Sequence, residues 1–325
     1  MSRAESLVVS YSRILLRIFF RRIEVTGVEN IPQEGGGLLV SWHPNGTIDG
    51  AVLHTHFPRR IVFGARHGLL KIPILGWMLR QIGTVPIYRR RDMTRDESNA
   101  ERQASNRRSI DALAQAVAEG GFAALFPEGR SHDEPYVHEL KTGAAHLYYR
   151  AFELTPAGSP PPVIIPVGLH YNKKSIWGSQ VLVTYHPPLQ LPADLATPAT
   201  GAEDRGVGDR REQARRLTTE LDRVLHDVIL ATESWDLHNL FQRTRKLIRA
   251  EGLARRGARS QPPDIVERVR HFEHIWKNYQ LAIASHSHET RKVLAGVAFY
   301  DRCLRALGIE DHELDGASWE VSPRK

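Results

Sequence analysis

Residues 37–50, GLLVSWHPNGTIDG, contain the features that decide the fold. The first six of these residues form an almost continuous apolar run, which is typical of a strand buried on both faces of a sheet. Proline, asparagine and glycine follow at positions 44–46 and force a turn. A buried strand that runs into a polar turn predicts an α/β domain whose functional residues lie at the ends of its strands.

Outward from this stretch, strand-like and helix-like segments alternate over roughly residues 20–190. A strand and then a turn are predicted within residues 21–32. Further strands are predicted at residues 59–65, 85–90, 122–126, 162–171 and 180–189. Helices are predicted at residues 69–83, 98–119 and 142–153. We therefore expect a mixed, mostly parallel sheet that is flanked by helices.

An amphipathic helix is predicted over residues 1–22, before the α/β domain of residues 23–191. Its apolar residues recur at helical spacing, and four arginines interrupt or end the run: Arg13, Arg17, Arg21 and Arg22. No apolar run approaches the roughly 20 residues that a transmembrane helix needs, and no cleavage-like site marks a secretory signal. A helix in the lipid headgroup region and a helix packed on its own domain both remain open.

The composition changes after residue 191. Residues 192–208 are rich in Pro, Ala, Gly, Thr and charge, which is typical of a linker. Long helical patterns follow, at residues 209–251 and 263–307, and predict a helical C-terminal region over residues 209–325. A lid, a membrane-docking surface and a dimer contact all remain open as roles for this region.

The chain of 325 residues has a formal net charge of +7 and a sequence pI of about 9.6, which indicates an anionic partner. Its basic residues are dispersed and no nucleic-acid-binding signature is present, so we do not expect nucleic acid to be the partner. The single cysteine, Cys303, excludes an intramolecular disulfide and fits a structural thiol in a reducing compartment.

The polar turn holds a histidine and an aspartate, His43 and Asp49, with five residues between them. Histidine is the natural general base near neutral pH, and a carboxylate that accepts its second ring proton fixes its tautomer and orientation. A tight turn brings two such side chains together. A structural or solvated pair of polar residues is the alternative interpretation of the same spacing.

Two other predicted strand ends carry groups suited to an anionic substrate. Arg89 closes GTVPIYR and offers bidentate recognition of a phosphate or carboxylate, although a run of charge is also typical of a solvated loop. The turn PEGRS follows the strand FAALF and holds Glu128, Gly129, Arg130 and Ser131. Its glutamate suits hydroxyl groups, and its arginine and exposed N–H groups suit a phosphate, unless the turn only caps the following segment.

Together these runs resemble a known family. SWHPNGTIDG, then GTVPIYRR, then FPEGRS with LKTGAA behind it, then IIPVGL are similar to the four successive blocks of the glycerolipid acyltransferases. That family includes the glycerol-3-phosphate and 1-acylglycerol-3-phosphate acyltransferases. The resemblance covers about residues 20–190, and the order of the four blocks is more specific than any block alone.

The resemblance implies a role for each matching residue. His43 would be the general base and Asp49 its orienting partner. Arg89 and the third-block residues would bind the phosphate and glycerol of the acceptor: Glu128, Gly129, Arg130 and Ser131. Pro166 of the fourth block would serve the acyl-donor side or the strand itself, since proline ends or kinks a ladder of strand hydrogen bonds.

The same resemblance implies the partners and the place of action. The acyl donor would be acyl-CoA or acyl carrier protein, the acceptor a phosphorylated glycerol, and neither a metal ion nor a cofactor would be required. The enzyme would act at the cytoplasmic face of an anionic membrane, as a peripheral or monotopic protein. The acceptor position that is acylated and the acyl-chain length are left open.

The chain departs from the family pattern in its first block, because the common form has four residues between histidine and aspartate. We interpret the five-residue spacing, with its HPN sequence, as the mark of a subgroup whose acceptor preference differs. A lysophospholipid or an ornithine lipid is therefore an alternative acceptor, and a catalytically silent, basic lipid-binding relative is the alternative from another class. His286 and His288 are not expected to bind a metal ion, because residues at i and i+2 of a helix point apart.

Overall fold

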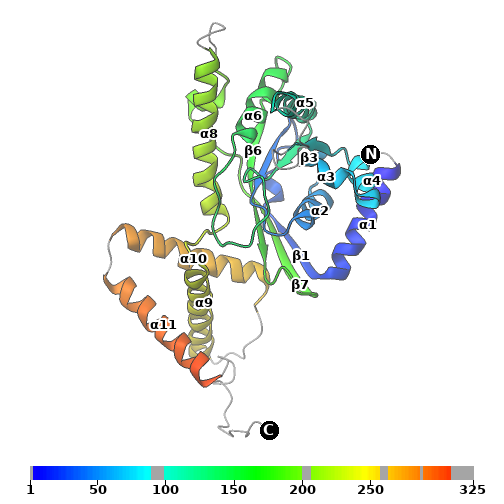
Figure 1. Ribbon diagram of the computed structural model, residues 1–325. Coiled ribbons are helices and arrows are strands. Elements are labelled where there is room, and N and C mark those ends of the chain that lie inside the picture. The colour runs from blue at the N-terminus through cyan, green and yellow to red at the C-terminus, as the bar shows by residue number, and fades with distance from the viewer. Residues whose placement is uncertain (1–2, 89–98, 200–205, 257–262, 286–287, 309–325) are drawn as a thin grey trace. The chain divides into compact units, whose positions relative to one another are not determined.

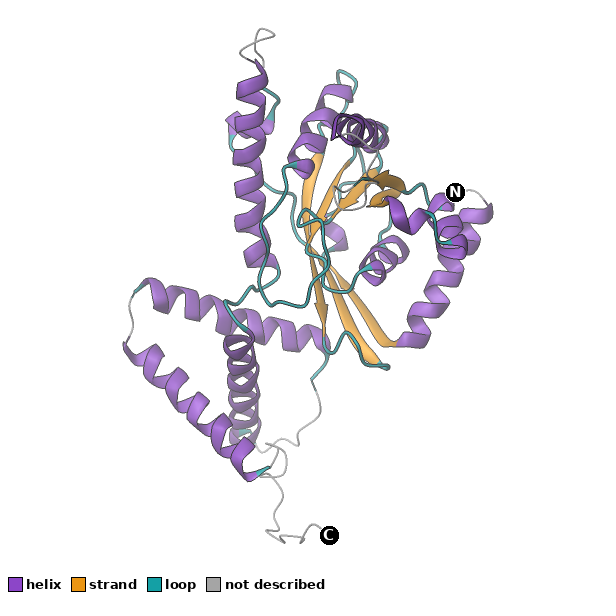
Figure 2. Ribbon diagram, in the orientation of Figure 1, coloured by secondary structure: helices purple, strands orange, loops and turns teal. Residues whose placement is uncertain are grey.

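The computed structural model describes residues 3–88, 99–199, 206–256, 263–285 and 288–308. The chain forms two compact units, Met1–Ala231 and Thr232–Lys325, which we describe separately (Figure 1). The first unit is an α/β domain and the second is helical, as Figure 2 shows by the confinement of the strands to one part of the chain.

The first unit contains all seven strands found in the described ranges. They are β1 (Phe20–Thr26), β2 (Gly37–Ser41), β3 (Ile61–Arg66), β4 (Val85–Ile87), β5 (Phe122–Leu125), β6 (Val163–Tyr171) and β7 (Ser179–Tyr185). Its helices are α1 (Arg3–Phe19), α2 (Thr47–His56), α3 (His67–Leu70), α4 (Pro73–Gln81), α5 (Asn99–Ala118), α6 (Gly143–Leu154), α7 (Ala193–Ala196) and α8 (Gly206–Val228). A short 3₁₀ turn, η1, covers Val28–Asn30.

The strands form one sheet in the order β1-β7-β6-β2-β5-β3-β4. All neighbouring pairs are parallel except β6 and β7, which are antiparallel. The predicted mixed, mostly parallel sheet is therefore confirmed. Because β2, β3, β4, β5 and β6 run in one direction, the loops that follow them meet at the same edge of the sheet.

Strand β2 lies between β5 and β6 and is buried along its whole length. Alternate residues point to opposite faces of the sheet, so Leu38 and Val40 pack with α5, α6 and α8, whereas Leu39 packs with α1 and α2. The sheet therefore has an apolar core on each side, which explains the continuous apolar run in the sequence.

The N-terminal helix was predicted correctly. Helix α1 buries Val8, Val9 and Leu16 against the domain, and its last residues lead directly into β1. Among the helices that the structure describes, none has the length and apolarity needed to cross a membrane.

One predicted helix, at residues 69–83, is divided in the structure. Helix α3 ends at Leu70 and α4 begins at Pro73, because proline has no N–H group to continue the first helix but fits the first turn of the second. The prediction that Pro166 ends or kinks its ladder holds for the pairing with β7, which stops at Val167, but not for the pairing with β2. Pro166 pairs with Val40 of β2 inside an unbroken β6, and it lies just before β6 begins to pair with β7 at Val167.

The helical unit contains α9 (Trp235–Arg255), α10 (Ile265–Ala284) and α11 (His288–Leu307). The side chains of Ser234 and Asp264 cap α9 and α10 by accepting hydrogen bonds from backbone N–H groups three residues later. Phe241 and Phe272 pack at its centre. Each of the two long predicted helical patterns thus corresponds to two helices.

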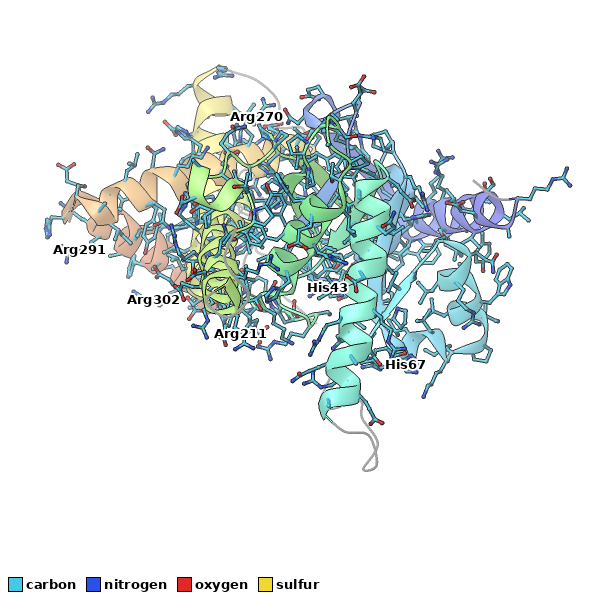
Figure 3. The ribbon with its side chains drawn as sticks, turned by 90° about the horizontal axis from the view of Figure 1, so that it is seen from above. His43, His67, Arg211, Arg270, Arg291 and Arg302 are labelled. Atoms are coloured by element: carbon cyan, nitrogen blue, oxygen red, sulfur yellow. The ribbon has the colours of Figure 1, made fainter. Side chains whose placement is uncertain are left out.

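The division into units falls elsewhere than in the predicted linker of residues 192–208. Helix α8 packs on α6 and β6, so the first unit extends to Ala231. The chain leaves α8 through Leu230, which has a positive φ of 56°. Basic side chains are spread over both units, as the labelled Arg211 of α8 and Arg270, Arg291 and Arg302 of the helical unit illustrate (Figure 3).

Candidate active site

The turn after β2 brings His43 and Asp49 into contact. Gly46 adopts a positive φ of 58°, which ends the turn and allows α2 to begin at Thr47. Asp49 then lies in the first turn of α2, and its Oδ2 atom is 2.9 Å from Nδ1 of His43. The five-residue spacing is thus accommodated by a turn of proline, asparagine and glycine followed by one helical turn.

Asp49 is completely buried and is held by two further donors. The backbone N–H of Asn45 donates to Oδ2 over 2.7 Å, and the hydroxyl of Tyr171 donates to Oδ1 over 2.6 Å. Burial, and after it the negative charge of Asp49, raise the pKa of the Tyr171 phenol well above its ordinary value, so the hydroxyl stays a donor. Three donors to one buried carboxylate fix its position.

The imidazole of His43 is held on its other side by an aromatic ring. Phe126 stacks on it with 4.0 Å between the ring centroids and an interplanar angle of 16°. The side chain keeps 18% of its surface exposed, whereas that of Asp49 keeps none. With Nδ1 directed at Asp49, the ring presents Nε2 as the nitrogen that can accept a proton from another molecule.

Lys174, in the turn between β6 and β7, connects the first-block turn to the third-block loop. Its Nζ donates to the carbonyl of Pro44 over 2.6 Å and to that of His132 over 3.3 Å. It also lies 2.6 Å from Oδ1 of Asp133. The loops after β2, β5 and β6 are therefore fastened to one another at the edge of the sheet.

The third-block loop after β5 is organised around a buried carboxylate. Glu128 is 3% exposed, and its Oε2 accepts hydrogen bonds from Nε2 of His132 and from the backbone N–H of His138. Its Oε1 is buried with no hydrogen-bond partner in the described part of the chain. Glu128 therefore holds the loop together, and one of its oxygens remains to be satisfied.

The same loop places potential metal ligands close together. Atoms of His132, Glu134 and His138 lie within 4.8 Å of one another. Arg130, however, donates to Nδ1 of His138 over 2.7 Å, which leaves the proton of a neutral ring on Nε2, facing Glu134 at 3.4 Å. In the structure these residues thus form a hydrogen-bond network, in which the Nε2 proton of His138 faces Glu134.

The other predicted site residues are distributed unevenly. Gly129 adopts a positive φ of 67° and lies at the cavity described below, where Lys141 packs over it. Arg130 and Ser131 are exposed, and neither is among the residues that line the cavity. Arg89 lies outside the described residues, as does His286. The predicted phosphate-binding role of these arginines therefore stays a prediction.

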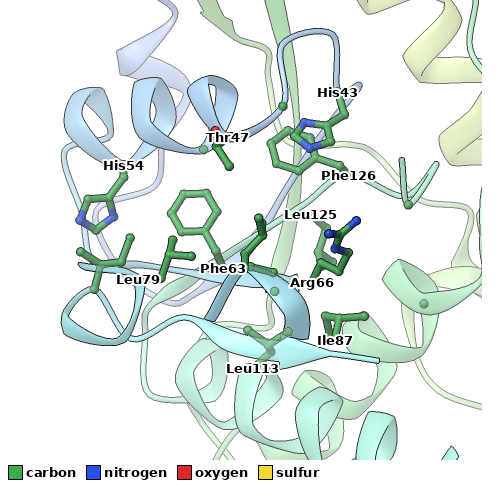
Figure 4. A pocket seen from close by; sticks show the side chains of 18 of the residues that line it. His43, Thr47, His54, Phe63, Arg66, Leu79, Ile87, Leu113, Leu125 and Phe126 are labelled. Atoms are coloured by element: carbon green, nitrogen blue, oxygen red, sulfur yellow. The ribbon is translucent and has the colours of Figure 1, made fainter. Parts of the chain in front are cut away.

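An apolar cavity of about 680 Å³ begins at His43. It runs along the face of α2 that carries Thr47 and His54, and β3, α4 and α5 close it. His43 and Phe126 lie at one end of the cavity, and His54 and Leu79 lie at the other (Figure 4). Most of its wall is apolar, and Phe63, Leu79 and Leu113 are examples. Its volume and lining are typical of a site for a small molecule with an apolar part.

Three cationic side chains interrupt this apolar wall. Arg66 of β3, Arg102 of α5 and Lys141, just before α6, all line the cavity. Lys141 is exposed, and an added Cβ at Gly129 would lie 2.8 Å from its Nζ, so the glycine gives this side chain room. The cavity that His43 faces thus combines a long apolar wall with a few positive charges.

Sequence reasoning missed Tyr171, Lys174 and Lys141. The first two follow from strand register: Ser41 pairs with Val167, so β6 extends four residues past β2 and brings Tyr171 level with the first-block turn. Lys141 was present in the run LKTGAA that accompanies the third block. Its position behind FPEGRS was the available signal.

Comparison with known proteins places this geometry in context. Residues 22–170 match the family model described as Acyltransferase. An uncharacterized acyltransferase of Schizosaccharomyces pombe is 21% identical over 203 residues, which are 62% of this chain and 27% of that protein. Glycerol-3-phosphate O-acyltransferase 2 of Saccharomyces cerevisiae is 23% identical over 196 residues, 60% of this chain and 24% of that protein. The matched part thus spans about a quarter of each of these relatives.

Among solved structures, the chain is similar to the 1-acyl-sn-glycerophosphate (LPA) acyltransferase PlsC from Thermotoga maritima. The two are 16% identical, with a TM-score of 0.40, and the match covers 68% of this chain and 79% of that one.

Proposed function

We propose that this chain, whose residues 22–170 match the Acyltransferase family model, acylates a hydroxyl of glycerol-3-phosphate or 1-acylglycerol-3-phosphate, with His43 as general base. The observation that carries this proposal is the His43–Asp49 pair at the end of a largely apolar cavity. A base that can accept a proton, beside a space suited to an acyl chain, is what a hydroxyl acyl transfer requires.

The proposed reaction proceeds without a covalent enzyme intermediate. Nε2 of His43 accepts the proton of the acceptor hydroxyl while the hydroxyl oxygen attacks the thioester carbonyl carbon. The carbon–sulfur bond then breaks, and the departing thiolate takes the proton from the imidazolium, which restores His43. Asp49 stabilises the imidazolium and keeps Nε2 directed at the acceptor. General-base assistance of this kind contributes roughly 10²–10⁴-fold.

The negative charge that develops on the thioester oxygen needs hydrogen-bond donors. Asn45 is excluded, because its N–H already donates to Asp49. The N–H groups of Ile48 and Asp49 are used within the turn. Gly46 and Thr47 line the cavity beside His43, at the start of α2, where the first N–H groups of a helix have no acceptor within the helix. We assign the stabilisation of the oxyanion to the backbone N–H groups of Gly46 and Thr47.

The two substrates would occupy different parts of the cavity. The apolar wall between α2, α4 and α5 suits the acyl chain. The phosphate of the acceptor would lie at the positively charged part, close to the third-block turn, where Lys141 and Arg66 line the cavity. Arg130 and Arg89 would add to this charge, as the family blocks imply, and Glu128 would use Oε1 for a glycerol hydroxyl.

The donor would be acyl-CoA or acyl carrier protein, and the place of action the cytoplasmic face of a membrane. An exposed basic helix, α1, at the edge of the domain supports this location. The five-residue spacing of the first block supports one alternative, a subgroup that acylates a lysophospholipid or an ornithine lipid.

An acceptor panel tests the proposal. Purified full-length protein is given one long-chain acyl-CoA, and in parallel acyl carrier protein, with glycerol-3-phosphate, 1-acylglycerol-3-phosphate, glycerol, a lysophosphatidylcholine or a lyso-ornithine lipid. We expect transfer to a phosphomonoester acceptor to exceed transfer to glycerol by at least roughly tenfold, about the value of one charge-assisted contact. Preference for another acceptor overturns the acceptor assignment, and transfer to none of them overturns the activity.

A further inference from the structure

The third-block loop gathers two histidines and a glutamate around one point. Oε2 of Glu134 lies 3.1 Å from Nδ1 of His132 and 3.4 Å from Nε2 of His138. One potential ligand atom of each residue lies within 4.8 Å of those of the other two. Two ligand atoms of a tetrahedral zinc ion, each about 2.1 Å from the metal, lie roughly 3.4 Å apart. Both separations from Glu134 are therefore close to those that one metal ion requires.

A buried carboxylate fixes the tautomer of His132. Oε2 of Glu128 accepts a hydrogen bond from Nε2 of this histidine, so the lone pair of a neutral ring is on Nδ1. A histidine that binds a metal ion commonly donates its other ring N–H to a carboxylate, which orients the ring and makes it a stronger ligand. His132 thus has the supporting partner that is typical of a metal ligand.

Nδ1 of His132 has no hydrogen bond of its own. The atom is buried without a hydrogen-bond partner in the described part of the chain, although Oε2 of Glu134 lies 3.1 Å away. The contact is close enough for a hydrogen bond but does not have the alignment of one, so a proton between the two atoms is poorly placed. Two acceptors that face one another repel unless a cation lies between them. A metal ion bonds each atom along its own lone pair and satisfies both.

The surroundings suit a divalent transition-metal ion. The carboxylate groups of Glu128 and Glu134, when ionised, supply two negative charges. The side chain of Glu134 is 43% exposed and that of His138 is 19% exposed, so an ion can enter from solvent. Imidazole with carboxylate suits zinc and related ions, whereas magnesium and calcium prefer oxygen ligands alone. Three protein ligands leave a further coordination position for water.

The same geometry links the cluster to Arg130. Nη2 of Arg130 donates to Nδ1 of His138 over 2.7 Å, so a neutral ring carries its proton on Nε2. A metal ion on Nε2 requires the other tautomer: the ring gives up the Nε2 proton and takes one on Nδ1, with no net change in its protons. Nδ1 then no longer accepts a hydrogen bond from Arg130. Metal binding therefore releases this exposed guanidinium from the loop.

We propose that His132, Glu134 and His138 form a site for zinc or a related divalent transition-metal ion, and that its occupation frees Arg130. The site stands on the geometry of the loop alone. Its effect on activity rests on the proposed function, in which Arg130 contributes to binding the acceptor phosphate. The metal ion then regulates acceptor binding and takes no part in the acyl transfer itself.

Equilibrium dialysis of the full-length protein against Zn²⁺, without a histidine tag, tests the site. Glu134→Gln and His138→Ala each remove one ligand at a partly exposed position, and His132 is left intact because its side chain is only 5% exposed. Loss of a supporting partner alone costs roughly ten- to a hundredfold in metal affinity, so each ligand variant should lose at least as much. Circular dichroism verifies that the variants are folded.

His271→Ala is the matched control for the dialysis. His271 lies four residues after Glu267, as His138 lies four residues after Glu134, and 4.0 Å separates Nδ1 of His271 from Oε1 of Glu267. This pair has no third ligand among the described residues, so its loss should leave Zn²⁺ binding unchanged.

Four outcomes of the dialysis overturn the site. They are no saturable binding of Zn²⁺ by the unmodified protein, unchanged affinity in either ligand variant, an equal loss in the control, and binding of Mg²⁺ as tight as that of Zn²⁺. The last result would show only attraction of cations to acidic groups.

Arg130→Ala tests the link between the site and the acceptor. Removing the competing donor should tighten Zn²⁺ binding by roughly two- to tenfold, the value of one hydrogen bond. In acylation assays with glycerol-3-phosphate, saturating Zn²⁺ should lower the acceptor KM of the unmodified protein by a similar factor and leave that of Arg130→Ala unchanged.

Unchanged or weaker Zn²⁺ binding by Arg130→Ala overturns the release of Arg130. An acceptor KM that does not fall in the unmodified protein, or that falls equally in Arg130→Ala, overturns it as well. If the unmodified protein acylates no acceptor, the proposed function fails, while dialysis still decides whether the metal site exists.

Discussion

The turn that carries His43 and the loop that carries Arg130 follow two neighbouring parallel strands, β2 and β5, but they are built differently. In the first, a completely buried aspartate with three hydrogen-bond partners directs a partly exposed histidine at a cavity. In the second, the buried glutamate is bonded within its own loop, and the arginine is exposed. A base needs a fixed position, whereas an exposed long cation can adapt to its ligand.

The hydrogen bonds of the first-block turn fix the position of His43 before any substrate binds. Preorganised hydrogen bonds cost no rearrangement at the moment of reaction, so they are most valuable where a charge develops. We therefore expect changes in the first-block turn to lower kcat. Changes among the cations should raise the KM for the acceptor.

The largest effect in this comparison should come from Asp49→Asn. The amide cannot stabilise an imidazolium as a carboxylate does. Its NH₂ group accepts no hydrogen bond, and it replaces either the oxygen that accepts from His43 and Asn45 or the oxygen that accepts from Tyr171. We expect kcat to fall roughly 10²–10⁴-fold, with a smaller change in the acceptor KM. Steady-state kinetics of folded protein, verified by circular dichroism, check this. A kcat within about threefold of the unmodified value would place Asp49 outside the mechanism.

A smaller effect on activity is expected from removing one cation. Lys141 and Arg130 are the two candidates for binding the acceptor phosphate. Lys141 lines the cavity, whereas Arg130 does not. Lys141→Ala should raise the KM for a phosphorylated acceptor by roughly ten- to a hundredfold, the value of a charge-assisted hydrogen bond, and leave the KM for the acyl donor nearly unchanged.

Arg130→Ala is the matched comparison for Lys141→Ala, and its effect on the acceptor KM should be smaller. A larger effect in Arg130→Ala would show that the exposed arginine turns toward the substrate, as the family block implies. That result would sharpen the comparison between a base in a fixed position and exposed cations that reorient to bind the substrate.

The smallest effect should come from Tyr171→Phe. The change removes one donor to Asp49 but leaves the hydrogen bonds of Asn45 and His43 in place. Its cost to stability should be about 1–3 kcal/mol, because a buried carboxylate oxygen loses its partner, and kcat should fall by roughly tenfold or less. Chemical denaturation and kinetics of the same sample measure both. A loss of kcat as large as that of Asp49→Asn would contradict a purely positioning role for the hydroxyl.

Much of the fold could be predicted from the sequence because its strands are apolar on both faces. The runs GLLVSW and PVIIPVGLHY contain β2 and β6 of the sheet, and the ordered blocks lie within or beside residues 22–170, which match the Acyltransferase family model. The helical tail was predicted less accurately. Periodicity alone does not mark where one helix ends and the next is capped, as at Leu230 and Ser234.

The site was predictable only where its partners are close in sequence. His43 and Asp49 are joined by one turn, so their contact could be expected from spacing. Tyr171 and Lys174 reach that turn from more than 120 residues away, through the register of β6 on β2. A single sequence carries no signal for such register. The exposed position of Arg130 likewise depends on its hydrogen bond to His138.

The most direct test of the central claim is the kcat of His43→Ala, measured with acyl-CoA and the best acceptor of the panel. His226→Ala is the control, because its side chain lies on α8 and is not among the residues that line the cavity. General-base catalysis by His43 predicts a loss of roughly 10²–10⁴-fold in kcat, with the fold intact and the control unchanged. Near-normal acyl transfer by folded His43→Ala protein would contradict the account.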